Sequence, residues 1–145
     1  MEIGEAIGAL IAAFNRGSLD VPDGFFTART TFTLNNRSYE SYLGGSSDDP
    51  LIRLLARGVA GYRTAARALQ YALPGAVVSL GSLSEPDASG MRSAMLRVEG
   101  QLRDSGEPFA AQASLRLCCT QRELTAVEVS CAEDDLARIA ASRRA

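Results

Sequence analysis

A run of alternating residues over positions 91–131 constrains the fold more than any other feature of the chain. Along its first part, apolar side chains occupy every second position and mostly polar ones the positions between: Ala94, Leu96, Val98 and Leu102 against Met95, Arg97, Glu99 and Gln101. Residues 109–117 and 125–129 repeat the pattern. A period of two is typical of a strand with one buried face. The run therefore predicts three antiparallel strands that share one apolar face.

The turns between these strands predict their register. Residues 103–108 are rich in turn formers, and a second turn is expected at 120–122. Folding the chain back across the first turn gives the pairs Leu102 with Phe109, Val98 with Ala113 and Leu96 with Leu115. A slip by one residue would mix the two faces, so the apolar pattern favours this register. In the third strand, Thr125, Val127 and Val129 are expected to face inward.

Two helical segments are candidates to cover the apolar face, which needs a second layer. Residues 2–16 have an apolar stripe at helical spacing: Ile3, Ile7, Leu10, Ile11 and Phe14. The second segment covers residues 50–73, with Asp49 as N-cap, Pro50 in the first turn and a break near Gly58. Pro74 and Gly75 end it.

Further strands are expected on either side of the second helical segment. Residues 26–34 alternate and are rich in β-branched and aromatic side chains, and Asn35 with Asn36 predicts a two-residue turn into a return strand over 37–41. Residues 76–85 predict another strand, with Val78 and Leu80 on one face. Residues 132–145, acidic at the start and basic at the end, are either a terminal helix or a tail.

The order of elements predicts an α+β fold, in which a curved antiparallel sheet wraps around the N-terminal helix and the second helical segment as a cone-shaped α+β barrel. Residues 1–131 form a single domain and residues 132–145 a C-terminal helix or tail. A chain of 145 residues is long enough for one domain with its own core. We expect no ionisable group in the dry space between the sheet and the helices.

Composition argues against several classes of function. The net charge of −2 gives no basic surface for nucleic acid. No segment predicts a membrane span or a secretory signal, so we expect a cytoplasmic protein without a membrane partner. Histidine, the commonest general base and metal ligand, is absent.

The three cysteines are predicted to be free structural thiols. Cys118 and Cys119 point to opposite faces of a strand, and Cys131 falls opposite Ala111 or Ala113. This register does not bring any two of them together for a disulfide. No zinc ligand set is visible, and no histidine is available to activate a nucleophilic thiol. We predict no metal, no cofactor and no catalytic residue.

The chain resembles the nuclear transport factor 2-like superfamily (cystatin-like α+β folds), which includes ketosteroid isomerases, SnoaL-like polyketide cyclases and limonene epoxide hydrolase. The resemblance depends on the order of elements and on three stretches: 14–17 at the end of the first helix, 33–37 at the hairpin, and 92–100 leading into 109–117. It implies an apolar cavity between the sheet and the helices, and dimers, which are common in that superfamily. The chain lacks both the acid and tyrosine set of the steroid isomerases and the Asp-Arg-Asp cluster of the epoxide hydrolases. The resemblance therefore implies no catalytic residue.

Aromatic residues are the candidates for binding a ligand in such a cavity: Phe14, Phe32, Tyr39, Tyr42 and Tyr62. The tyrosines either orient a ligand through their hydroxyls or pack as amphipathic core residues. It is also open whether the cavity is free or filled by Phe14, Phe32 and Phe109. The arginines of the second helical segment form either an anion site or a solvated helix face: Arg53, Arg57, Arg63 and Arg67.

Two functions are compatible with these residues. The first is a non-catalytic binding module for a small apolar ligand or a protein partner, forming a homodimer through the sheet face, where Met95, Leu124 and Ala126 are apolar residues on the nominally wet side. The second is a SnoaL-like cyclase or isomerase that positions a cyclic apolar substrate with tyrosine hydroxyls as donors.

Overall fold

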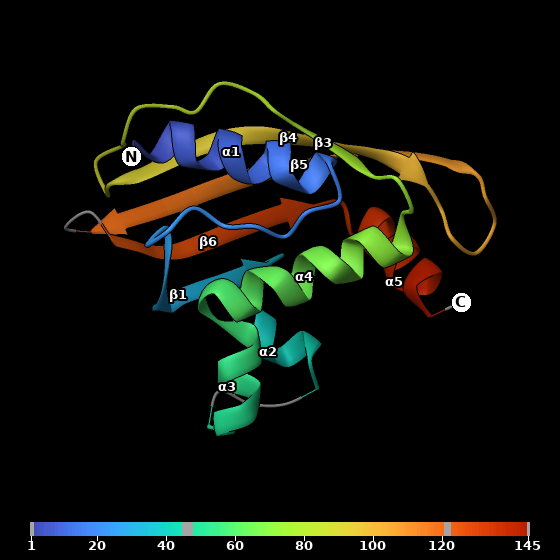
Figure 1. Cartoon of the computed structure of the whole chain (residues 1–145), viewed down its shortest axis with the longest axis horizontal. Helices are drawn as coiled ribbons and strands as arrows, with labels where there is room; N and C mark the ends of the chain where they lie inside the picture. The colour runs from blue at the N-terminus through green and yellow to red at the C-terminus, as the bar shows by residue number, and fades with distance from the viewer. Residues whose placement is uncertain (1, 45–47, 121–122, 145) are drawn as a thin grey trace.

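The computed structural model describes residues 2–44, 48–120 and 123–144. The elements in chain order are α1 (Ile3–Asn15), β1 (Phe26–Leu34), β2 (Arg37–Ser38), α2 (Tyr39–Tyr42), α3 (Pro50–Ala56), α4 (Gly58–Ala72), β3 (Val77–Leu80), β4 (Met91–Gln101), β5 (Pro108–Thr120), β6 (Glu123–Cys131) and α5 (Glu133–Arg143). The strands form one curved, unclosed sheet in the order β2-β1-β6-β5-β4-β3 (Figure 1). The predicted α+β class and the wrapping of the sheet around helices are confirmed.

The meander of β4, β5 and β6 is the centre of the sheet, and its inward face agrees with the sequence pattern. Its register differs from the prediction by two residues: Leu96 lies opposite Ala113 and Val98 opposite Ala111. The turn is tighter than expected, because the Leu102 amide donates to the Glu107 carbonyl at 2.9 Å. A slip of two residues keeps every side chain on its own face, so the alternation could not detect it. The turn predicted at 120–122 includes residues 121 and 122, which lie outside the described part of the chain.

A bulge changes the start of β6. Cys118 lies opposite Ala126 but Cys119 lies opposite Leu124, so Thr125 is the extra residue. The alternation shifts there, and Leu124 is buried in the core although it was expected on the wet face. It therefore lends no support to a dimer through the outer face of the sheet.

The strand β1 has the predicted bounds, but it makes the sheet mixed because it runs parallel to β6. Asn35 and Asn36 both have positive φ, 51° and 65°, as a two-residue hairpin turn requires. The return strand β2 is shorter than predicted and gives way to the helical turn α2 at Tyr39. β3 also ends early, at Leu80, although hydrogen bonds from Gly81 and Ser84 to β4 continue the pairing.

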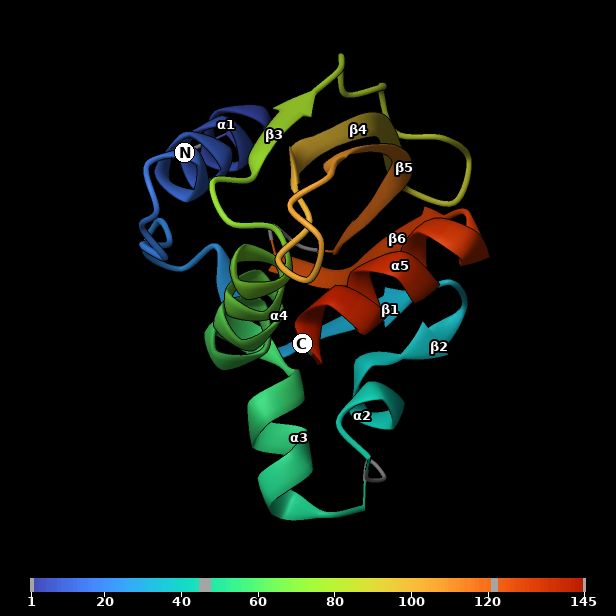
Figure 2. The ribbon, with the colours of Figure 1, turned by 90° about the vertical axis from the view of Figure 1, so that its right-hand side faces the viewer.

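The helices cover the concave face of the sheet. The α1 stripe buries Ile7, Leu10 and Phe14, and Asp49 caps α3 by accepting from the Leu51 amide at 3.0 Å. Figure 2 shows α1 and α4 along one side of the curved sheet and α5 across its near end. Residues 133–143 are thus a helix packed on the domain, one of the two possibilities that the sequence left open. Among the described residues, no helix is both long and apolar enough to cross a bilayer.

Candidate functional site

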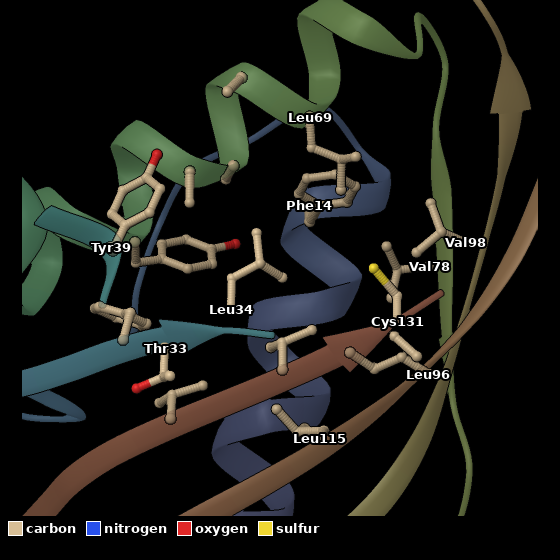
Figure 3. A pocket seen from close by; sticks show the side chains of 18 of the residues that line it. Phe14, Thr33, Leu34, Tyr39, Leu69, Val78, Leu96, Val98, Leu115 and Cys131 are labelled. Carbon is tan, nitrogen blue, oxygen red and sulfur yellow. The ribbon is translucent and has the colours of Figure 1, made fainter. Parts of the chain in front are cut away.

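The main feature of the interior is a cavity of about 420 Å³ between the concave face of the sheet and the helices. Its walls come from α1, β1, α2, α4, β3, β4, β5, β6 and α5 (Figure 3). Most of the lining is aliphatic or aromatic; representative residues are Leu10, Leu69, Leu96, Val98, Leu115 and Val129. The alternation of β4 and β5 places these side chains inward, and the stripes of α1 and α4 close the opposite wall.

All of the predicted ligand-binding residues line this cavity: Phe14, Phe32, Tyr39, Tyr42 and Tyr62. Their role in binding stays a prediction. Phe109 is not part of the lining; it packs with Leu73 and Leu102 in a second core cluster. The space is therefore bordered by Phe14 and Phe32 and is not filled by the three phenylalanines together.

The lining is not free of charge, and here the sequence expectation was wrong. Asp135 and Arg143, both on α5, border the cavity. The signal was available: Leu136, Ile139, Ala140 and Arg143 follow helical spacing and form the face of α5 turned to the cavity. Because the charge pattern of residues 132–145 fits a tail as well as a helix, it did not place these side chains at the cavity.

The three tyrosine hydroxyls differ in their partners. Tyr42 donates to the Leu34 carbonyl at 2.8 Å, so this hydroxyl is already used within the fold. No residue in the described part of the chain forms a hydrogen bond with the hydroxyl of Tyr39 or Tyr62. Burial raises the pKa of both, and for Tyr39 the nearby Arg143 partly offsets the rise. Both hydroxyls are therefore neutral donors at pH 7.

Cys131 contributes a thiol to the cavity. Its side chain lines the cavity (Figure 3), and the strand register sets Cys131 opposite Ala113, one of the two expected positions. Burial raises the pKa of the thiol, and Asp135 and Glu133 raise it further. The thiol is therefore protonated at neutral pH and reacts slowly, through a small thiolate fraction, so its reaction rate can report on access to the cavity.

The cavity meets the surface between α4 and α5. A surface hollow lined by Thr64, Arg67, Ala68, Tyr71 and Arg143 shares Ala68 and Arg143 with the cavity. Beside it, the Arg103 guanidinium lies 3.9 Å from the centre of the Tyr71 ring. The opening is thus bordered by arginine side chains, while the wall behind it is apolar.

The four arginines that the sequence offered as an anion site have different surroundings in the structure. Arg57 donates from Nε to Glu40 at 2.9 Å in a largely buried pair, and Arg63 donates to the Leu19 carbonyl at 3.3 Å. Arg67 belongs to the surface hollow. Arg53 is exposed on α3. The four residues do not form one anion site. Within the described residues, no group of three metal-ligating side chains is close enough to hold a metal ion.

Ser142 holds α5 in place beside the opening. Its hydroxyl is fully buried, donates to the Ala72 carbonyl at 2.7 Å and accepts from the amides of Arg103 at 2.8 Å and Asp104 at 3.3 Å. One side chain thus joins α5 to the end of α4 and to the β4–β5 turn. Arg138 adds a two-point pair with Asp104, at 2.8 and 3.1 Å.

We expect Ser142→Ala to destabilise the protein by about 2 kcal/mol, because buried backbone groups lose their partner. Urea unfolding followed by circular dichroism measures the loss. Arg138→Gln is the control: its pair is partly exposed, so it is expected to cost less than about 1 kcal/mol. A Ser142→Ala protein as stable as the parent would show that the hydroxyl does not fasten α5.

Comparisons with known proteins agree on the fold. No protein-family model matches the sequence. No curated protein matches it either. Among solved structures, a protein from Jannaschia sp. CCS1, provisionally assigned as a SnoaL-like polyketide cyclase, is similar with a TM-score of 0.65 at 11% identity, covering 98% of this chain and 91% of its own.

Two further structures represent other branches of the same fold. An NTF2-like protein of unknown function from Exiguobacterium sp. 255-15 has a TM-score of 0.62 at 12% identity, covering 88% of this chain and 98% of its own. A protein with a ketosteroid isomerase-like fold from Catenulispora acidiphila has a TM-score of 0.55 at 14% identity, covering 86% and 83%. At these identities the likeness concerns the fold alone. The chain has the nuclear transport factor 2-like fold, in the α+β form common to SnoaL-like and ketosteroid isomerase-like proteins.

Proposed function

We propose that this protein is a non-catalytic binding module that takes a small, cyclic, apolar ligand into the cavity between its sheet and its helices. The observation that carries the proposal is the cavity itself, about 420 Å³ and lined mainly by apolar side chains. Protein interiors are close-packed and contain few voids larger than a water molecule. The volume falls in the range of pockets for small molecules, about 300–1,000 Å³.

The direct test uses 1-naphthalenemethanol, a neutral bicyclic compound, in a thermal-shift measurement. We expect the midpoint of unfolding to rise by about 4 °C at a ligand concentration ten times Kd, because a ligand that binds only the folded state stabilises it by about 1.4 kcal/mol. An unchanged midpoint at saturating solubility would contradict the proposal.

Two controls assign the effect to the cavity. In Ala113→Phe, the new ring would occupy the space beside Leu96 and Leu115, so the shift is expected to disappear. The second control uses a Cys118→Ser, Cys119→Ser background, in which Cys131 is the remaining thiol. Bound naphthalenemethanol is expected to slow the reaction of Cys131 with a disulfide reagent, and this readout does not depend on Ala113→Phe folding.

A second function, cyclase or isomerase chemistry by positioning, is favoured by the hydroxyls of Tyr39 and Tyr62. Both line the cavity and have no partner among the described residues. They are therefore available to donate to a carbonyl or enolate oxygen of a substrate. If this function holds, Tyr62→Phe lowers turnover of a cyclic ketone substrate while leaving binding of naphthalenemethanol unchanged. Tyr42→Phe is a poor probe for this purpose, because its hydroxyl binds the Leu34 carbonyl.

We also propose a homodimer through the outer face of the sheet. The support is the exposed apolar side chain of Met95, which is 52% exposed there, beside the pairs of Arg97 with Glu99 and Arg116 with Glu128. A charge at the centre of such an interface would disrupt it. Sedimentation of the parent and of Met95→Glu would distinguish a dimer from a monomer.

A further inference from the structure

We infer that the ligand carries a carboxylate at one end of its apolar body, and that Arg143 with the Tyr39 hydroxyl binds this group at the opening of the cavity. The inference depends on the proposed ligand-binding function and specifies the class of ligand. It is carried by the position of Arg143, which borders both the apolar cavity and the surface hollow between α4 and α5.

Arg143 is exposed, and no other group in the described part of the chain engages its guanidinium. Six arginines there are paired with acids, and several others besides Arg143 are not; the pairs are Arg29 with Glu123, Arg37 with Glu133, Arg57 with Glu40, Arg97 with Glu99, Arg116 with Glu128 and Arg138 with Asp104. Among the unpaired arginines, Arg143 borders the apolar cavity. Arg143 has neither an ion pair nor a hydrogen bond in that part of the chain. A guanidinium offers planar donors that match the two oxygens of a carboxylate.

A second donor lines the same cavity as Arg143. Tyr39 is buried, with 8% of its surface exposed, and it lines the cavity. Its hydroxyl has no hydrogen-bond partner among the described residues. It is close enough to Arg143 that the guanidinium lowers its pKa against the effect of burial. A guanidinium and a neutral phenol near one another are complementary to a single anionic acceptor.

The acids near the cavity do not cancel this preference. Asp135 borders the cavity but precedes Arg143 by eight residues on α5, about 12 Å along the helix axis. Glu133 is engaged by Arg37 at 3.6 Å and by Asn35 at 3.2 Å. The hollow on the solvent side of Arg143 also contains Arg67. An anion entering between α4 and α5 therefore passes positive charge, with the apolar wall behind it.

The test compares ligands that share one ring system and differ only in the attached group. Calorimetric titration at pH 7.5 measures Kd for 1-naphthoate, 1-naphthalenemethanol and protonated 1-naphthylmethylamine. We expect naphthoate to bind about tenfold more tightly than the alcohol, and the amine more weakly than both. In Arg143→Gln the affinities of acid and alcohol should agree within about twofold, while the circular dichroism spectrum and the midpoint of thermal unfolding, which report correct folding, stay near those of the parent.

Arg144→Gln is the matched control, because Arg144 is the neighbouring exposed arginine and does not line the cavity. It should keep the tenfold preference for naphthoate. Equal binding of acid and alcohol by the parent protein would overturn the inference and leave the proposed function standing. Tightest binding of the amine would do the same, and it would make Asp135 the group that recognises the ligand. An equal effect of Arg144→Gln and Arg143→Gln would also overturn it. If neither alcohol nor acid binds, the proposed function itself fails.

Discussion

Gly58→Ala is expected to lower the free energy of unfolding by about 3 kcal/mol, which corresponds to a fall of roughly 10 °C in the midpoint of thermal unfolding. Gly58 lies where the chain passes from α3 into α4 and has a φ of +64°. A non-glycine residue in this left-handed region costs roughly 1–2 kcal/mol.

The backbone of β1 adds a steric cost at the same position. A Cβ on Gly58 would lie 2.7 Å from the Thr27 carbonyl oxygen, so a strand or a helix would have to shift. Both elements line the cavity, through Phe26 on β1 and Tyr62 on α4, whose rings stack with centroids 5.4 Å apart. We therefore expect Gly58→Ala to weaken ligand binding as well as stability.

Gly24→Ala separates the two contributions. Gly24 has a similar φ of +73°, but a Cβ there would meet nothing within 4 Å. Gly24→Ala should lower the free energy of unfolding only by the cost of the left-handed backbone conformation, about 1 kcal/mol. Equal losses for the two variants, measured by urea unfolding, would show that the contact between Gly58 and Thr27 does not constrain the fold.

Glu40→Gln is expected to cost about 2 kcal/mol at pH 7. The carboxylate is 5% exposed and accepts from Arg57 at 2.9 Å, while the Arg57 side chain keeps 28% exposure. Removing one charge of a buried pair leaves the other without compensation, and partial hydration of Arg57 limits the loss. Because α2 carries Tyr39 and Tyr42, the pair also anchors one border of the cavity.

The effect of Glu40→Gln should depend on pH in a defined direction. Burial would raise the pKa of Glu40, but hydrogen bonds from its own backbone amide and from Arg57 outweigh burial and hold the pKa below 4.5. As pH falls, the unfolded state binds the proton first, so the stability that Glu40 contributes is present above pH 4.5 and is lost below it. The difference between parent and Glu40→Gln, measured by urea unfolding, should be constant near neutrality and shrink as the pH falls below 4.5.

Glu133→Gln is the matched control for this titration. Its pair with Arg37 spans 3.6 Å, and the two side chains are 70% and 56% exposed. An exposed pair contributes less than about 1 kcal/mol and often nothing measurable. A loss as large as that of Glu40→Gln, or a Glu40→Gln effect that grows in acid, would contradict the assignment of a buried ion pair.

Local chemistry explains the features that could be predicted from sequence. The hairpin at Asn35 and Asn36 and the cap of α3 by Asp49 depend on residues next to one another in the chain. The faces of β4 and β5 and the stripe of α1 depend only on periodicity. The candidate aromatic residues followed from these patterns and from the order of elements, and all of them line the cavity.

Register needed the tertiary structure. At Gly100 a Cβ would lie 3.3 Å from the Leu73 side chain and from the Ala76 backbone, so the end of β4 packs tightly on the chain between α4 and β3. Phe109 lies opposite this glycine, two places from the predicted pair. The bulge at Cys118 and Cys119 likewise moved Leu124 into the core. Alternation repeats every two residues, so it cannot detect a slip of two, and it assumes an unbroken strand, so it cannot locate a bulge.

The sequence by itself determined which side chains of α1, β4 and β5 turn inward, and therefore that sheet and helices face one another across an apolar space. Only the tertiary structure decided which polar groups at that space are already bound. The Tyr42 hydroxyl donates to the Leu34 carbonyl and Arg57 donates to Glu40. Tyr39 and Arg143 have no such hydrogen-bond partner in the described residues. The reason is physical: periodicity is a property of neighbouring residues, but hydrogen bonds and ion pairs join groups that only folding brings together.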